Sequence, residues 1–323
     1  MLAIQIDHTG GPDVLTPKTL PDPEPGSGQI RIRHGAIGLN FVETYQRSGL
    51  YPMTLPKVLG QEAAGTVDAV GEGVTRFHVG DRAGYVSGSS GAYAERAVID
   101  AGKAVKLPGF VSDEDAAAIL LKGLTAEMLV RRVYPLKAGQ RALVHAAAGG
   151  VGQLLTQWAK AIGATVFATA GSPAKLKIAA EQGADHLVAY TEAGWADRVQ
   201  ALTNGDGVEV VYDGVGKDTF DGSLKSLAKR GHLVLYGGAS GPVPPVDPLA
   251  LMRGGSLYLT RPTLFDYCAT TAELDDAAEA LFGLMQAGKL NVTVGQRFAL
   301  KDAAGAHRAL EARQTTGSTL LIP

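Results

Sequence analysis

The stretch LVHAAAGGVGQLLTQWAKAIGATVFATAGSP, residues 143–173, decides the fold of this chain. A short apolar run, 141–146, leads into a cluster of small residues. Apolar side chains then recur with the spacing of one helix face, at Val151, Leu154, Leu155, Trp158, Ala159 and Ile162. A second apolar run, 164–169, follows. This order predicts a strand, a glycine-rich turn, a helix and a second strand.

The same alternation continues toward the C-terminus. Four further apolar runs, which we expect to be strands, lie at 186–190, 208–213, 232–237 and 256–261. Helical patterns lie between several of them, at 173–183, 195–205 and 218–231. Six strands recurring at roughly 22–24 residues, mostly with helices between, predict an α/β domain with a doubly wound parallel sheet. The runs are apolar throughout, as burial on both faces requires.

The flanking parts of the chain have a different texture. The first 120 residues or so carry short β patterns separated by Gly and Pro, such as the alternating segment 29–40. A long helical pattern covers 270–290. The last apolar run, 318–323, lies too far along to be a seventh strand of the parallel sheet. We expect it to return to the N-terminal domain, so that the α/β domain is inserted in the chain.

Composition excludes several classes of protein. The 323 residues are 46% hydrophobic and 19% charged, with a formal net charge of -2, which argues against disorder and against nucleic acid or an anionic membrane as a partner. The lone cysteine, Cys268, forms neither an internal disulfide nor a thiolate zinc cluster. The N-terminus lacks a signal-peptide pattern, and no apolar run reaches the ~18–20 residues that span a bilayer. We therefore expect a soluble, cytoplasmic protein.

The small-residue turn resembles a dinucleotide-binding fingerprint. Residues 147–152 read Ala-Ala-Gly-Gly-Val-Gly, so alanine stands at the first glycine position of G-x-G-x-x-G. Its place between a strand and an amphipathic helix strengthens the signal, because small residues let the backbone approach a pyrophosphate at the helix N-terminus. The alternative is a tight turn that binds no cofactor.

The end of the second predicted strand indicates which dinucleotide is bound. NAD-preferring domains place a carboxylate there to hold the ribose 2′-hydroxyl. This chain instead has Gly171, Ser172 and Lys175, with no carboxylate before Glu181. A hydroxyl and an ammonium suit a 2′-phosphate, which favours NADPH. Tyr190, at the end of the third strand, is a further candidate; the alternatives are a solvated lysine and a packed tyrosine.

Longer segments resemble a known family. They are GLNFVETYQRSGLYP (38–52), LPKVLGQEAAGTVDAVGEGVTRFHVGDRA (55–83), LLKGLTAEML (120–129), VHAAAGGVGQLLTQWAKAIGA (144–164), VVYDGVGKDTF (210–220) and GSLYLTRPTL (255–264). Together they resemble the zinc-free quinone oxidoreductases of the medium-chain dehydrogenase/reductase superfamily, the branch related to zeta-crystallin. The resemblance implies a GroES-like catalytic domain from residues 1–124 and 264–323, a Rossmann domain from 125–263, and a homodimer.

The chain departs from the zinc alcohol dehydrogenases of that superfamily. Where those enzymes carry metal ligands, it has Asn40 and the run Gly60-Gln61-Glu62. No cysteine precedes Cys268, and no two histidines are spaced H-x-x-x-H. A zinc site needs three or four N, S or O ligands, so we expect no metal.

The resemblance implies two sets of site residues. The polar lining of the hydride-transfer site is assigned to Asn40, Tyr51, Gln61, Lys122 and Thr125, with ordinary loop hydrogen bonding as the alternative for each. Cofactor contacts are assigned to Tyr45, Ala148, Gly149, Gly150, Val151, Gly171, Ser172, Lys175, Tyr190, Gly237, Gly238, Thr263, Leu264, Phe265 and Arg313. Tyr45 could belong to either set, and Arg313 is alternatively a surface helix arginine.

These features favour an NADPH-dependent quinone reductase that works without a metal. A quinone is already an electrophile, so the protein needs only to hold the nicotinamide against it and donate hydrogen bonds to its oxygens. One alternative is a reductase of activated C=C bonds in alkenals or enones. Another is a cofactor-binding protein with a structural or RNA-binding role. The sequence leaves open the physiological acceptor and whether electrons pass singly or as hydride.

Overall fold

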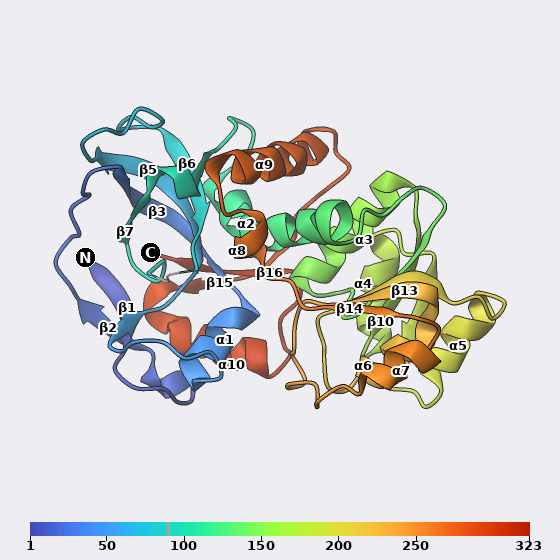
Figure 1. The fold of residues 1–323 in the computed structure, drawn as a ribbon. Coiled ribbons are helices and arrows are strands. Elements are labelled where there is room, and N and C mark those ends of the chain that lie inside the picture. The colour runs from blue at the N-terminus through green and yellow to red at the C-terminus, as the bar shows by residue number, and fades with distance from the viewer. Residues whose placement is uncertain (89–90) are drawn as a thin grey trace. The chain divides into compact units, whose positions relative to one another are not determined.

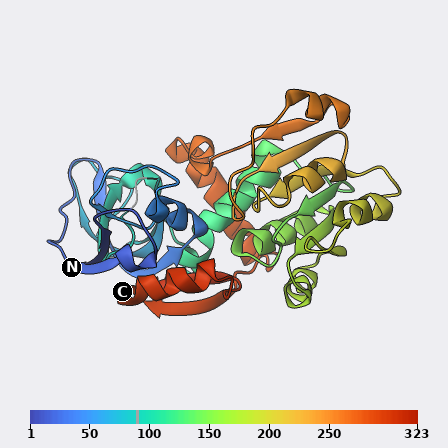
Figure 2. The same cartoon turned by 90° about the horizontal axis from the view of Figure 1, so that it is seen from below.

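The computed structural model describes residues 1–88 and 91–323, which divide into two compact units. Unit 1 comprises Met1–Lys122, Cys268–Phe282 and Val292–Pro323, and unit 2 comprises Gly123–Tyr267 and Gly283–Asn291. Figure 2 marks both chain ends on unit 1. Because unit 2 is mostly one continuous stretch between two parts of unit 1, it is an insertion in the chain.

Unit 2 is built on the predicted six-stranded sheet. Its strands are β9 (Arg141–Val144), β10 (Thr165–Ala170), β11 (His186–Ala189), β12 (Val208–Asp213), β13 (Leu227–Leu235) and β14 (Tyr258–Thr260). Their spatial order is β11-β10-β9-β12-β13-β14, and every neighbouring pair is parallel. The order of the strands reverses between β9 and β12, and ligands of such sheets bind at the carboxyl ends of the strands beside this point.

Helices flank this sheet (Figure 1). They are α3 (Gly150–Ile162), α4 (Pro173–Glu181), α5 (Trp195–Leu202), α6 (Phe220–Ser226) and α7 (Pro248–Arg253). The short helix α8 (Leu264–Tyr267) follows β14 in the chain. The central strand β9 shows why they must cover both faces: Ala142, Leu143 and Val144 are all fully buried, so side chains pointing either way leave water. The doubly wound prediction is confirmed.

The helix predicted over 218–231 is wrong in its second half. α6 ends at Ser226, and β13 begins at Leu227. Leu227 is 6% exposed and pairs with Val208 of β12, before a register shift. The strand therefore starts earlier than its apolar run, through Lys229 and Arg230, because pairing with β12 overrides the helical preference of these residues.

Unit 1 is mainly β, as predicted. A seven-stranded sheet contains β3 (Gln29–Leu39), β5 (Glu62–Val70), β6 (Arg82–Val86), β7 (Arg96–Asp100), β8 (Ala104–Lys106), β15 (Val294–Ala299) and β16 (Ser318–Ile322). A smaller sheet contains β1 (Leu2–Ile6), β2 (Thr16–Thr19) and β4 (Lys57–Val58). The last strand returns as expected: β16 runs antiparallel to β3, with Thr319 opposite Leu39.

Few helices accompany these sheets. They are α1 (Phe41–Ser48), α2 (Asp113–Glu127), α9 (Thr271–Gln286) and α10 (Ala303–Glu311). A π-helical segment, Met128–Val133, and 3-10 turns at Pro12–Val14, Ala101–Lys103 and Leu300–Asp302 complete the elements. α9 confirms the helical pattern at 270–290. Within the described ranges, no helix is long and apolar enough to cross a membrane.

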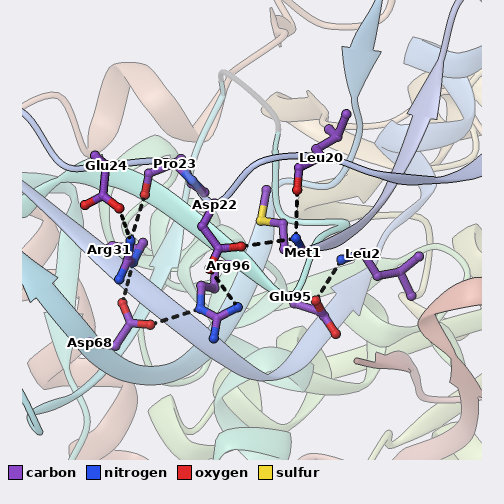
Figure 3. A network of polar contacts seen from close by, with 10 residues as sticks. All are labelled: Met1, Leu2, Leu20, Asp22, Pro23, Glu24, Arg31, Asp68, Glu95 and Arg96. Atoms are coloured by element: carbon purple, nitrogen blue, oxygen red, sulfur yellow. Dashed lines mark hydrogen bonds and ion pairs between the residues drawn. The ribbon is translucent and has the colours of Figure 1, made fainter.

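Ion pairs between strands fix the register of unit 1 (Figure 3). Asp68 on β5 accepts hydrogen bonds from Arg31 Nε on β3 at 2.7 Å and from Arg96 Nε on β7 at 3.1 Å. Asp22 lies 3.2 Å from Arg96 and 3.1 Å from the ammonium of Met1. One cluster thus joins three neighbouring strands to the segment before β3. Pairs of opposite charge on neighbouring strands stabilise sheets in this way.

Candidate active site

The end of β3 and the start of β5 place two predicted site residues together. Gly38 of β3 pairs with Glu62 of β5, so Asn40, just after β3, and Gln61, just before β5, lie at the same edge of the sheet. Both are nearly buried, at 7% and 4% exposed. A Cβ at Gly38 would overlap the Glu62 carboxylate and the backbone oxygen of Ala117, so only glycine leaves room for both.

Glu43, which the sequence analysis missed, holds both loops. Its carboxyl group accepts from the backbone N–H of Asn40 at 2.7 Å and from that of Gln61 at 3.1 Å. Asn40 and Glu43 form the capping box of α1. Complete burial raises the pKa of Glu43 to about 8, while the Asn40 N–H and Lys122 act in the opposite direction. The N-x-x-E spacing before a helix was the available sequence signal.

Glu62 is a second buried carboxylate that connects the predicted donors. Its Oε2 accepts from Asn40 Nδ2 at 2.9 Å and lies 3.3 Å from Lys122 Nζ. Its Oε1 accepts from the backbone N–H of Leu121 at 2.7 Å. Three of the predicted residues, Asn40, Gln61 and Lys122, are therefore linked through two carboxyl groups that the sequence analysis did not assign.

The remaining residues of the predicted lining lie on neighbouring segments. Tyr45, half-buried on α1, and the exposed Tyr51 form an aromatic pair with ring centroids 5.3 Å apart. Thr125 is half-buried on α2, one turn after Lys122. Since Lys122 is the last residue of unit 1 and Thr125 belongs to unit 2, α2 carries one candidate in each unit.

A chain of polar contacts, buried except at Glu311, anchors α1 to α10. Arg47 of α1 bonds both carboxylate oxygens of Glu311 on α10, at 2.6 and 3.0 Å, and lies 3.3 Å from His307 Nδ1. A guanidinium only donates, so His307 Nδ1 accepts and its Nε2–H donates to the Tyr93 hydroxyl at 3.0 Å. Burial, together with Arg47, lowers the pKa of His307 to about 3, so the ring is neutral.

In unit 2, the glycine-rich turn after β9 fits a pyrophosphate. Gly149 is the N-cap of α3, and Gln153 N donates to Gly149 O, so the preceding N–H groups lie at the free end of the helix. A Cβ at Gly152 would overlap Ala146 O and Ala147 Cα. The turn therefore needs glycine at the third glycine position of the fingerprint, whereas the fully buried Ala147 stands at the first. Ala148, which follows it, is nearly buried.

The ends of β10 and β11 bring the adenosine-side candidates together. A Cβ at Gly171 would lie 3.1 Å from the Tyr190 hydroxyl. Ser172 is the N-cap of α4, and its Oγ accepts from Lys175 N at 3.4 Å. Lys175 and Tyr190 are half-buried. The serine hydroxyl therefore also has a structural role, which leaves its own hydrogen to donate.

The other cofactor candidates are spread over several loops. Gly237 packs so closely on the Gly214 backbone that a Cβ would overlap it. Gly238 follows it, half-buried. Thr263 is exposed just before α8, whose first two residues are Leu264, buried, and Phe265, half-buried. Arg313 is exposed, with φ of 59°, after α10 in unit 1.

The sequence analysis also missed a buried network beneath the nucleotide turn. His145, directly after β9, lies 2.7 Å from Thr169 Oγ1 and 2.9 Å from Ser223 Oγ. Asp213, at the end of β12, accepts from Ser223 Oγ at 2.8 Å and from the backbone N–H of Val215 at 2.8 Å. Burial lowers the pKa of His145. The network joins the ends of β9, β10 and β12 at the switch point of the sheet.

Metal-binding side chains do not gather at either site. Among residues 1–88 and 91–323, no three His, Cys, Asp or Glu side chains are grouped so that they could hold an ion.

Comparison with known proteins identifies the family. An alcohol dehydrogenase GroES-like domain matches residues 26–109, and a zinc-binding dehydrogenase domain matches residues 150–282. The quinone oxidoreductase of Pseudomonas aeruginosa is 50% identical over 321 residues, 99% of each chain. This chain belongs to the zinc-free quinone oxidoreductase family of the medium-chain dehydrogenase/reductase superfamily. The resemblance read from the sequence is confirmed.

A solved structure of a second quinone oxidoreductase and a relative with a different name are also similar to this chain. The structure of Escherichia coli quinone oxidoreductase complexed with NADPH has a TM-score of 0.98 and 44% identity, and the match covers 100% of both chains. A 2-haloacrylate reductase of a Burkholderia species is 40% identical over 332 residues, 100% of this chain and 99% of its own. The proteins similar to this chain therefore include some named for quinone oxidoreduction and one named for reduction of a 2-haloacrylate.

Proposed function

We propose that this protein is an NADPH-dependent quinone reductase. The observation that carries the proposal is a switch-point turn that fits a pyrophosphate, in a chain whose full length matches a quinone oxidoreductase complexed with NADPH. When bound, NADPH supplies the hydride. In unit 2, Gly149, Gly150 and Val151 would hold the pyrophosphate through backbone N–H groups.

The residues assigned from the sequence keep these roles as part of the proposal. The adenosine phosphate is assigned to Gly171, Ser172, Lys175 and Tyr190, with Arg313 as a further phosphate contact. The nicotinamide side is assigned to Gly237, Gly238, Thr263, Leu264 and Phe265. Asn40, Gln61 and Lys122 would donate hydrogen bonds to the quinone oxygens, with Tyr45, Tyr51 and Thr125 completing the lining. Residues 1–124 and 264–323 remain our prediction for the catalytic domain.

One assay tests the function. We would follow NADPH and NADH oxidation with 1,4-benzoquinone, with and without a chelator. We expect turnover that favours NADPH and resists the chelator. Bound NADPH without turnover of any quinone would contradict the proposal.

The second candidate is reduction of an activated C=C bond, which the Burkholderia relative favours. The same assay with an alkenal and with 2-chloroacrylate separates the two. A kcat/KM for either at least ten times that for every quinone tried would favour this candidate.

We also propose that the protein is a homodimer, which the family resemblance implies. β14 is the edge strand of the unit 2 sheet, and its residue Tyr258 is 55% exposed. Leu249 and Met252, on α7 just before it in the chain, are 53% and 61% exposed. Exposed apolar residues on a strand edge are typical of a pairing surface. Sedimentation should give a dimer, and Tyr258→Lys should shift it toward monomer. On the same family ground we propose a soluble cytoplasmic enzyme.

A further inference from the structure

The side-chain nitrogens of two predicted donors converge on Glu62. Asn40 Nδ2 and Lys122 Nζ both approach its Oε2, at 2.9 and 3.3 Å. Glu62 is fully buried, whereas the side chain of Lys122 is 8% exposed. The fully buried glutamate cannot touch a substrate. Asn40 and Lys122, whose nitrogens it binds, are slightly exposed, at 7% and 8%.

The chemistry of the carboxylate fixes how these donors point. A carboxylate only accepts, so Asn40 must turn its NH2 group, and not its oxygen, toward Glu62. The amide and the ammonium each donate one hydrogen to Oε2. The amide NH2 then keeps one further hydrogen and the ammonium keeps two. The backbone N–H of Leu121 on Oε1 prevents the carboxylate from rotating away. The cluster therefore presents hydrogen-bond donors, and no acceptors, to a neighbouring group.

We propose that Glu62 is a positioning residue that aims the Asn40 amide and the Lys122 ammonium at a carbonyl oxygen of the substrate. This inference rests on the proposed function and narrows it to acceptors whose oxygen gains negative charge. In this reaction the C–H bond of NADPH would break and its hydrogen would pass with both electrons to one quinone oxygen, forming an O–H bond, while the other quinone oxygen would become the anion. A proton from solvent then gives the hydroquinone, and NADP+ remains.

The effect should appear in the chemical step. Donors aimed at an oxygen that becomes an anion stabilise the transition state more than the ground state, and removal of one such donor lowers kcat by about 100–1,000-fold. When Asn40 and Lys122 are present but mispositioned, the loss should be smaller than for removal of a donor. We expect kcat to fall about 10–100-fold, with a smaller change in KM.

The test is Glu62→Gln, which keeps the size and the oxygen for Leu121 but places an NH2 group against both donors. Asp68→Asn is the matched control, because it also removes a carboxylate paired with basic side chains in unit 1, in the cluster of Figure 3. We expect kcat with 1,4-benzoquinone to fall 10–100-fold in E62Q and less than twofold in D68N. The dissociation constant of NADPH should change less than twofold in both.

Lys122→Met tests the pair from the other side and serves if E62Q does not fold. If Glu62 acts through Lys122, the two substitutions share one effect, so E62Q should cost clearly less in the K122M background than alone. K122M alone removes a donor, so it should lower kcat by about 100–1,000-fold, at least as much as E62Q, while NADPH affinity is kept.

The outcomes separate the inference from the function. An active wild type with E62Q or K122M equal to D68N would overturn the inference and leave the proposed function intact. Full additivity of E62Q and K122M would overturn it too. A wild type that reduces alkenals but no quinone would overturn the proposed function, and the same variants would then be compared with the alkenal. A wild type that reduces neither would overturn both.

Discussion

At the scale of single residues, Lys175 tests which dinucleotide the protein prefers. It lies in the first turn of α4, beside Ser172 and near the end of β10, where no carboxylate stands. We expect Lys175→Ala to weaken NADPH binding about tenfold or more, the loss of a charge-assisted hydrogen bond, and to leave NADH binding nearly unchanged. Titration by nicotinamide fluorescence measures both. Lys177→Ala, exposed on the same helix, is the control; equal weakening of both cofactors in K175A would contradict the phosphate assignment.

Gly152 tests the turn itself. A Cβ there meets backbone atoms of Ala146 and Ala147, so Gly152→Ala must displace the turn. We expect a loss of about 1–3 kcal/mol in the free energy of unfolding, typical of overpacking, and NADPH binding weakened more than tenfold. Gly283→Ala is the control, because nothing lies within 4 Å of its Cβ position in α9. Urea unfolding should show G283A slightly more stable than wild type. Unchanged NADPH affinity in G152A would contradict this account of the turn.

At the scale of elements, the loop between β12 and α6 is built on Asp213. Its buried carboxylate accepts from two backbone N–H groups, of Val215 and Gly216, and from the hydroxyls of Thr219 and Ser223. Asp213→Ala leaves these donors without an acceptor, and we expect a loss on the order of 3–5 kcal/mol. Tryptophan fluorescence during urea unfolding reports on it, since Trp158 and Trp195 lie in unit 2. The exposed Asp218→Ala should change stability by less than about 0.5 kcal/mol.

The elements also show what sequence patterns reach and where they stop. The six strands of unit 2 were predictable because strands buried on both faces are apolar runs, and Gly152 was predictable because the turn chemistry is local. β13 was misplaced because Leu227 joins the sheet through its partner Val208, far away in sequence. Glu62 was missed for the same reason, because its role depends on the pairing of β3 with β5, which no local pattern specifies. For Glu43 the capping box with Asn40 is a local pattern, but the bond to the backbone of Gln61 again depends on that pairing.

At the scale of the whole molecule, buried titratable groups set the pH dependence of unit 1. Burial lowers the pKa of His34 to about 4 and that of His307 to about 3, below the usual 6.5. Their contribution to the free energy of unfolding is complete above pH 6.5, and it is lost as the pH falls toward the pKa values in the folded protein. Burial raises the pKa of Glu43 from 4.5 to about 8. Its contribution is complete below pH 4.5 and is lost as the pH rises through 8.

These opposite slopes predict a maximum in the stability of unit 1. Between pH 4.5 and 6.5 the two imidazoles outweigh the one carboxyl group, so stability should rise with pH. Above pH 6.5 these imidazoles add no further change, whereas Glu43 still loses its proton, so stability should fall until about pH 8. Calorimetry from pH 5 to 8.5 would place the highest Tm near pH 6.5. In Glu43→Gln the decline above pH 6.5 should disappear, whatever the stability of that variant at its maximum. A decline of the same slope in E43Q would show that another buried group is responsible, because a glutamine has no proton to lose in this range.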